Sequence, residues 1–509
     1  MTSSASDDGP RVERPGMISV RQQPSFIRLV YSFALAPGGR QSEHRKPAAA
    51  VLAQLKERAP GFGWEDRKIL YDYVLPHLAD HMNAQDERDG EGEVGHWWRF
   101  AGGHPPTWAL RVNADREVEL TLNSVEFVFF RTGIGMLLLE IDPVSDLLDD
   151  WQDALHLSRF YRLPPPEGAN DEVEYSEPRS VFARRAPRLI PVEGDSSGAY
   201  WAGGLQGAKP CGFGRLIAGL MDELFGDRTW ERASVPGLLA PFSALFVDWP
   251  EANEVSKFEA LYRWRRQLRS SATVHAGDQR DLHAELRTYA TDMWLAYSSE
   301  GGGFFAGNAP HDDFFDHDLP DHLRRPYAFG YLLALHQRLA LSRFSEQIGR
   351  VVGASRGLWT SDSPPRDEIA LLQDDFLEYL TRCHFVQVLR TANHHANYKV
   401  WEEVLEVDAF ATEVELELRL LYERSTVAER ILADNRRDRL AGRVNAAVLG
   451  IAVPTVVLAI LAVAYPSGLG LLLTIVLTLT SIISGVGIGW LAATDASGDR
   501  RASARGPSA

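Results

Sequence analysis

Residues 444–494, VNAAVLGIAVPTVVLAILAVAYPSGLGLLLTIVLTLTSIISGVGIGWLAAT, contain no Asp, Glu, Lys or Arg. One crossing of a bilayer needs about 20 apolar residues, so this run is long enough for two. Pro466-Ser467-Gly468 supplies the residues of a tight reversal near its middle. The sequence therefore predicts two transmembrane helices, over 444–465 and 468–493, joined by a short turn.

The charged residues on either side of this run predict its orientation. Arginines precede the first span and follow the second, whereas the turn carries no charge; the flanking residues are Arg430, Arg436, Arg437, Arg439, Arg443, Arg500, Arg501 and Arg505. Under the positive-inside rule both termini are then cytoplasmic, with 494–509 as a cytoplasmic tail. Arginine far outnumbers lysine, which is typical of a GC-rich bacterial genome. We therefore expect a multi-pass protein of the bacterial inner membrane; a buried hairpin of a soluble core is the disfavoured alternative.

Composition excludes several other classes of protein. The formal net charge is −16, which argues against a protein that coats nucleic acid, because phosphate binding needs a basic excess. The chain has 2 cysteines, which excludes a disulfide framework and a cysteine-rich zinc site. Residues 1–25 lack the apolar run of a secretory signal and predict a disordered tail.

The body before the apolar run divides into two parts. Residues 26–310 alternate short strands and helices and predict a cytoplasmic α/β domain, with a Pro- and Gly-rich linker or excursion at 163–210. Residues 26–35 predict a strand, 64–82 and 368–407 predict helices, and the clearest hairpin joins 125–131 to 136–141. Residues 323–443 predict long helices that form a stalk and run directly into the first span. The expected fold class is an α+β cytoplasmic domain, then stalk helices, then a C-terminal transmembrane hairpin.

This order of parts resembles the CorA-type magnesium-channel family. The resemblance is architectural and covers most of the chain, and it implies a pentamer whose first span lines a pore for a divalent cation such as magnesium. Tyr465 occupies the place of the tyrosine in the family's Tyr-Gly-Met-Asn motif, but Gly-Met-Asn itself is absent. Asn445, Thr455 and Tyr465 are the pore-lining candidates under this resemblance.

The densest group of possible metal ligands is His311-Asp312-Asp313-Phe314-Phe315-Asp316-His317-Asp318-Leu319-Pro320-Asp321-His322. Carboxylates suit hard divalent ions, and imidazoles add affinity for transition metals. The candidate ligands are His311, Asp313, Asp316, His317 and His322. The alternative is an acidic, solvated loop whose Asp residues cap the helix that follows.

Two functions follow from these features. The first is an oligomeric channel or transporter for divalent cations, or a ligand-gated relative of one. The alternative is a membrane-anchored sensor, scaffold or effector without transport activity. No acyl-transfer, metalloprotease or kinase motif occurs, and nothing in the sequence specifies an enzyme. Lipid and further copies of the same chain are the expected partners, and nucleic acid is not.

Overall fold

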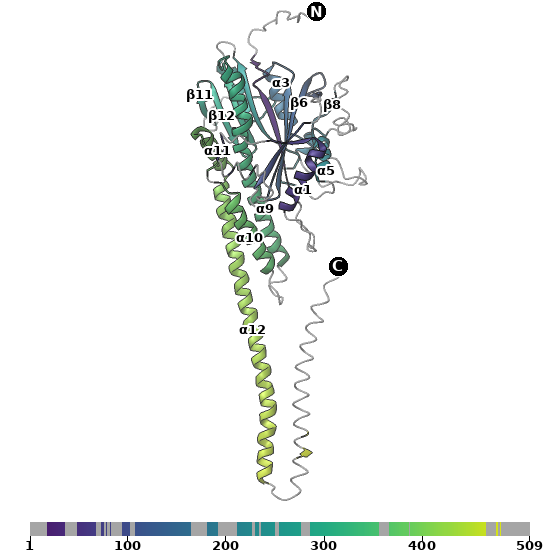
Figure 1. The fold of residues 1–509 in the computed structure, drawn as a ribbon, viewed down its shortest axis with the longest axis vertical. Coiled ribbons are helices and arrows are strands. Elements are labelled where there is room, and N and C mark those ends of the chain that lie inside the picture. The colour runs from purple at the N-terminus through teal and green to yellow at the C-terminus, as the bar shows by residue number, and fades with distance from the viewer. Residues whose placement is uncertain are drawn as a thin grey trace, which may run out of the picture. The chain divides into compact units, whose positions relative to one another are not determined.

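The computed structural model describes residues 18–35, 48–67, 73–75, 78, 82, 94–101, 107–163, 181–191, 211–225, 230–233, 236–249, 254–275, 286–355, 366–385, 387–464, 475–476 and 479, although not every side chain within them (Figure 1). The chain divides into two compact units. The first comprises Met1–Gln347 and Leu372–Leu416, and the second comprises Ile348–Leu371 and Glu417–Ala509.

The first unit is built on one mixed sheet, in which the described strands number 13. The main path runs in the order β11-β12-β13-β10-β2-β7-β6-β4-β3, with β1, β5, β8 and β9 attached beside it. Strands β10 and β13 pair in parallel, and the other printed pairs of strands are antiparallel. The strands are β1 (Ser19–Val20), β2 (Phe26–Leu35), β3 (Trp64–Asp66), β4 (Gly95–Phe100), β5 (Thr107–Arg111), β6 (Glu117–Phe130), β7 (Ile134–Pro143), β8 (Leu189–Pro191), β9 (Trp230–Arg232), β10 (Ala240–Asp248), β11 (Leu286–Ala290), β12 (Met293–Ser298) and β13 (Gly301–Gly307).

One face of this sheet carries the main hydrophobic core. Alternate residues of the central strands point to it, including Leu29 of β2, Phe127 of β6 and Leu139 of β7. Four helices supply the opposing apolar side chains: α1 (Ala48–Arg58), α3 (Leu148–Ser158), α5 (Gly214–Phe225) and α6 (Glu254–Arg265). Because both faces are covered, β2 and β7 are buried along almost their whole length.

The second face of the sheet is covered by the helical segment that begins near residue 313. This segment consists of η5 (Phe314–Asp318), α8 (Leu319–His322), η6 (Leu323–Tyr327) and α9 (Ala328–Ser355). Phe329 stacks on Trp97 at 5.8 Å between ring centroids, and His336 stacks on Phe130 at 3.9 Å. The helix α11 (Ala392–Val404) also lies on this unit and contacts β12.

Strand β13 explains the run of three glycines at 301–303. A Cβ atom on Gly303 would lie 1.9 Å from the carbonyl oxygen of Ser243 in the parallel neighbour β10. A Cβ on Gly302 would lie 2.7 Å from the Trp401 ring of α11. Glycine is needed here because the backbone of β13 comes this close to its neighbours.

Several elements expected from the sequence are confirmed, among them the strand at 26–35 and the hairpin of β6 and β7. The helix expected over 64–82 is wrong at its start, because Trp64–Asp66 form strand β3, which pairs with β4. Residues 19–25 are not part of a disordered tail, since β1 pairs with β10. The helix expected over 368–407 is divided into α10 (Arg366–Arg382) and α11, and β8 lies inside the expected linker.

The second unit contains most of α12 (Val407–Ala464), a helix of 58 residues. Among the residues that the structure describes, no helix combines the length and the apolar character needed to cross a membrane. The predicted transmembrane hairpin is corrected accordingly, and so is the predicted multi-pass location in an inner membrane. Residues 444–464 instead continue the helix that begins at Val407, and only 475, 476 and 479 of the second expected span are described. The tail expected over 494–509 lies outside the described residues.

Candidate functional site

The three residues expected to line a pore do not form a described pore. Asn445 and Thr455 lie on α12 with exposed side chains, and Tyr465 lies outside the described residues. The reading of the protein as a channel or transporter for divalent cations depended on a membrane-crossing pair of helices. It is overturned by the same finding that corrects the hairpin.

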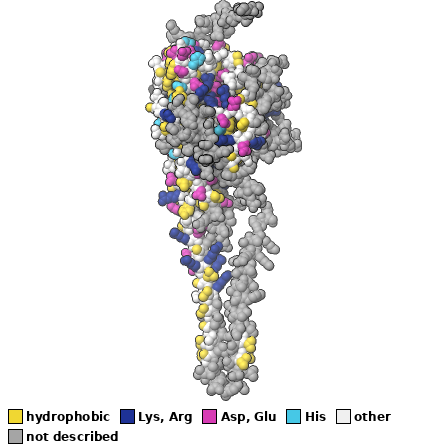
Figure 2. All heavy atoms as spheres, in the orientation of Figure 1, with side chains coloured by type: hydrophobic (Ala, Val, Ile, Leu, Met, Phe, Trp, Pro, Cys, Tyr) yellow, Lys and Arg dark blue, Asp and Glu magenta, His cyan; other side chains and the backbone are white. Residues whose placement is uncertain are grey.

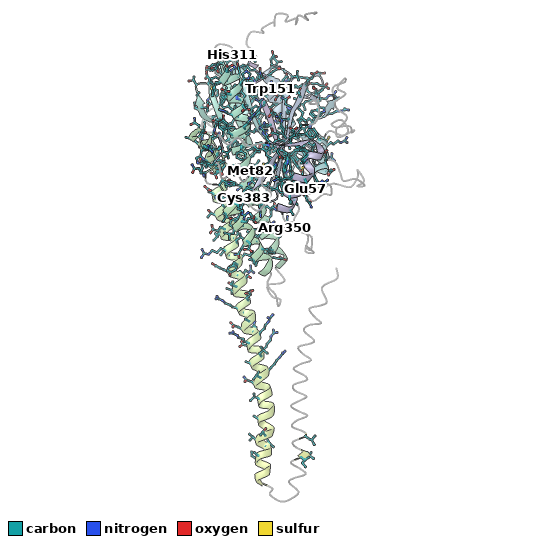
Figure 3. All side chains as sticks on the ribbon, in the orientation of Figure 1. Glu57, Met82, Trp151, His311, Arg350 and Cys383 are labelled. Atoms are coloured by element: carbon teal, nitrogen blue, oxygen red, sulfur yellow. The ribbon has the colours of Figure 1, made fainter. Side chains whose placement is uncertain are left out.

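Four of the residues expected to bind a metal lie on consecutive helical turns, His311 precedes that helix, and the five face different neighbours. Arg21 donates to Asp316 Oδ1 at 2.9 Å, and its Nη1 lies 3.3 Å from His311 Nδ1. The side chain of His311 is 69% exposed and lies at the surface of its unit (Figure 3). Asp313 and His317 are exposed. Asp312 Oδ1 accepts a hydrogen bond of 2.9 Å from Phe315 N, so an Asp caps the helix as the alternative predicted, although the helix already begins at Asp313, inside the predicted loop.

His322 lies apart from the other four. Its Nε2 is 2.8 Å from the hydroxyl of Tyr73, and its ring approaches that of His394. In the part of the chain that the structure describes, no three His, Cys, Asp or Glu side chains are grouped so that they could hold a metal ion. The structure thus does not bring the five candidate residues together.

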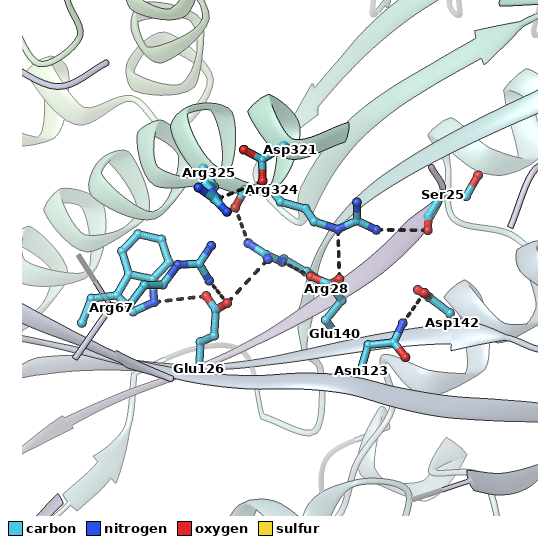
Figure 4. A network of polar contacts seen from close by, with 11 residues as sticks. Ser25, Arg28, Arg67, Asn123, Glu126, Glu140, Asp142, Asp321, Arg324 and Arg325 are labelled. Atoms are coloured by element: carbon cyan, nitrogen blue, oxygen red, sulfur yellow. Dashed lines mark hydrogen bonds and ion pairs between the residues drawn. The ribbon is translucent and has the colours of Figure 1, made fainter. Parts of the chain in front are cut away.

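A buried network of arginines and carboxylates occupies the second face of the sheet (Figure 4). Arg28 on β2 and Glu140 on β7 are direct cross-strand partners, and Arg28 Nε donates to Glu140 Oε2 at 2.6 Å. Arg324, from η6, donates to the other oxygen, Oε1, at 3.0 Å. Arg28 Nη1 also donates to the carbonyl oxygen of Arg324 at 2.6 Å. Arg28 and Arg324 therefore enclose the carboxylate of Glu140. Arg28 also holds the helical segment in place, through the backbone carbonyl of Arg324.

Glu126 on β6 forms the second half of the network. It accepts a hydrogen bond of 3.1 Å from Trp97 Nε1, lies 3.7 Å from Arg28 Nη2, and forms a close ion pair with Arg67. The Arg67 guanidinium lies 4.8 Å from the centroid of the Trp97 ring, an arrangement that favours a cation. Three arginines thus share two glutamates, which leaves one positive charge in excess.

Burial and neighbouring charge set the protonation states in this network. Burial alone would raise the pKa of Glu140, but the charges of Arg28 and Arg324 lower that pKa below its ordinary value. Burial and the charge of Arg28 lower the pKa of Arg67 to about 9. Asp142, on the same strand as Glu140, has its pKa raised well above the ordinary range, first by burial and then by the charge of Glu140.

These properties suit a structural anchor better than a catalytic centre. A general acid or base must exchange its proton near the working pH, whereas Glu140 is held ionised by two arginines. Sequence reasoning missed these residues. The available signal was a charged residue inside each of three otherwise apolar strands: Arg28 in FIRLVYSFAL, Glu126 in VEFVFF and Glu140 in MLLLEI.

The second unit presents a different kind of surface, along α12. Exposed arginines precede an exposed apolar stretch, which Figure 2 shows as dark blue side chains followed by yellow ones. The arginines are Arg436, Arg437, Arg439 and Arg443, and the apolar side chains that follow, each 44–63% exposed, are Val444, Val448, Val456, Val457 and Ile460. These five positions are distributed around the helix, because they do not share one 3.6-residue repeat.

No protein-family model, no curated protein and no solved structure matches this chain. The resemblance to the CorA-type family therefore stays a prediction, and so does the expected assembly into a homo-oligomer.

Proposed function

We propose that the protein is a sensor or scaffold without transport activity, whose helix α12 associates with an anionic lipid surface. The observation that carries the proposal is the junction in α12 between exposed arginines and exposed apolar side chains. Each of Val444, Val448 and Ile460 is more than half exposed. Leaving apolar surface in water costs about 25 cal/mol per Å², so a continuous apolar stretch favours an apolar partner.

The charge of the adjoining segment supports lipid as this partner. Arg436, Arg437, Arg439 and Arg443 stand within eight residues, with Asp438 among them. A basic group beside a membrane surface contributes about 1 kcal/mol to binding of anionic lipid. A helix with a basic segment and an apolar segment therefore matches a surface with anionic headgroups above hydrocarbon.

The first unit supplies the part that would sense or recruit. The central strands β2 and β7 of its sheet are buried on both faces, and the arginine network fixes the segment that leads into α9. A rigid body attached to a lipid-binding helix suits a scaffold, because bound partners are then held at one surface.

Flotation with lipid vesicles tests the proposal. We expect the full chain to float with vesicles of phosphatidylglycerol and phosphatidylcholine, and less with phosphatidylcholine alone. A chain that ends at Arg443 is expected to lose flotation. Replacement of the four arginines by glutamine is expected to remove the preference for the anionic vesicles and its dependence on salt.

Three results would contradict the proposal. The first is equal flotation of the full chain and the chain ending at Arg443. The second is a truncation that changes the oligomeric state but not vesicle binding, because the apolar stretch would then contact another copy of the chain. The third is influx of Mg²⁺ into vesicles that carry the full chain, beyond that of empty vesicles, since a scaffold conducts no ions.

A further inference from the structure

Three aromatic side chains from distant parts of the sequence meet on the first unit: Tyr73, His322 and His394. His322 ends α8, and His394 lies in the first turn of α11. Backbone hydrogen bonds hold the Tyr73 segment beside the start of α11. Leu75 N donates to the Val388 carbonyl at 2.9 Å, and Arg390 N donates to the Tyr73 carbonyl at 2.9 Å. The three side chains are thus positioned by the fold and not by proximity in the chain.

Their rings form a nearly equilateral triangle. The ring centroids lie 5.1 Å apart for Tyr73 and His322, 5.5 Å for Tyr73 and His394, and 5.7 Å for His322 and His394. The ring planes are inclined to one another by 65–85°. The Tyr73 hydroxyl already lies 2.8 Å from His322 Nε2, so one oxygen donor and one nitrogen donor are adjacent.

His394 brings a buried ring nitrogen to the triangle. Its side chain is buried, with 7% of the residue exposed, and its Nδ1 has no hydrogen-bond partner among the described residues. Buried polar atoms are nearly always satisfied, by protein, water or ligand, so an unsatisfied ring nitrogen calls for a partner.

We propose that Tyr73, His322 and His394 bind a divalent transition-metal ion of the class that prefers imidazole, such as Zn²⁺. Two imidazole nitrogens and one phenol oxygen supply three ligands, and water completes a tetrahedron. Magnesium and calcium fit this set poorly, because they prefer several carboxylate or carbonyl oxygens. On binding, the Tyr73 hydroxyl gives up its hydrogen bond to His322, and its proton passes to solvent if the phenolate is the ligand. Only His322 is shared with the ligands expected from the sequence.

Calorimetric titration of the full chain with Zn²⁺ tests this site. We expect one equivalent to bind, and His322→Ala or His394→Ala to weaken that binding at least tenfold. Tyr73→Phe is expected to weaken it less and to reduce the protons released. His317→Ala is the matched control, since His317 is exposed in the same helical segment and lies outside the triangle. Equal affinity in all four variants would show that Zn²⁺ binds elsewhere and would overturn the proposal.

A second measurement uses the unaltered chain and so does not depend on the folding of any variant. Diethylpyrocarbonate modifies accessible imidazoles, and mass spectrometry locates the products. Zn²⁺ is expected to slow the modification of His322 several-fold and to leave His317 unaffected. Equal modification of His322 with and without Zn²⁺ would contradict the proposal. Neither measurement involves lipid, so its result is independent of the flotation experiment.

Discussion

At the scale of single residues, His336 shows how burial changes the chemistry of a side chain. It is fully buried on α9, stacks on Phe130, and its Nε2 lies 2.9 Å from Thr132 Oγ1 in the turn between β6 and β7. Burial lowers the pKa of His336 to about 3. The ring therefore anchors α9 to this turn in its neutral form.

This pKa predicts a loss of stability in mild acid. Between pH about 3 and the ordinary histidine pKa of about 6.5, the unfolded chain binds a proton at His336 that the folded chain does not. The free energy of unfolding should therefore fall as the pH falls below about 6.5, by up to about 1.4 kcal/mol per pH unit from this residue. His336→Gln keeps a partner for Thr132. It should lower the number of protons taken up on unfolding by about one between pH 4 and 6, and so flatten the dependence of the unfolding free energy on pH.

Urea unfolding at several pH values measures this slope. His317→Gln is the control for the substitution itself, because His317 is exposed and lies outside α9. A slope in His336→Gln equal to that of the unaltered chain would mean that His336 is protonated in the folded state.

At the scale of elements, the arginine network joins three strands to one helical segment. Arg28, Glu126 and Glu140 come from β2, β6 and β7, and all three point to the second face of the sheet. Arg324 of η6 completes the contact with Glu140. The network therefore fixes where the segment at 313–327 crosses the sheet.

Glu140→Gln tests the strength of this connection. The variant leaves Arg28 and Arg324 without the carboxylate that they share. Removing one partner from a buried ion pair costs about 3–5 kcal/mol, so we expect a loss of that size in the free energy of unfolding at pH 7. Because the pKa of Glu140 is lowered, its contribution is present above the ordinary carboxyl pKa of about 4.3 and disappears as the pH falls.

Glu117→Gln is the matched control for this experiment. Glu117 pairs with Arg111 at 2.8 Å, but both side chains are more than 40% exposed. Surface pairs contribute about 0–1 kcal/mol, so the control should change the urea midpoint little. If both variants lost the same small amount, the network would not be the anchor described here.

At the scale of the whole molecule, α12 changes character along its length. Val414, Leu418 and Leu421 are buried, whereas the side chains at 433–445 are exposed. The first part of the helix therefore contributes to packing, and the later part is the exposed part to which the proposed function assigns lipid binding.

Two truncations distinguish these roles. A chain that ends at Ala433 should unfold within about 2 °C of the full chain, because it loses no buried side chain of the described part of α12. A chain that ends at Ala411 loses Val414, Leu418 and Leu421, and should unfold at a temperature several degrees lower. Calorimetry measures both. A large decrease for the Ala433 chain would show that the exposed part of α12 also stabilises the fold.

The amino-acid sequence was enough to predict the local elements that have a periodic hydrophobic pattern or characteristic turn residues. The strand at 26–35, the turn at Thr132-Gly133 and the long helices after residue 323 follow from hydrophobic spacing and turn residues. It also determined the separation between a mixed α/β body and an uncharged C-terminal stretch, although the transmembrane hairpin inferred from that stretch was wrong.

Which polar and charged side chains contact one another became apparent only in the folded chain. Strand register sets Arg28 opposite Glu140. Helix packing brings His322 to Tyr73, which is 249 positions away in the sequence, and to His394, which lies on another helix. Local patterns carry no information on such pairs, because the energies that select them arise from burial and from charges brought together by the folded chain. For this reason the sequence predicted one metal site along residues 311–322. In the folded chain, the side chains of this segment have separate partners: Asp316 pairs with Arg21, Asp321 with Arg325 and His322 with Tyr73.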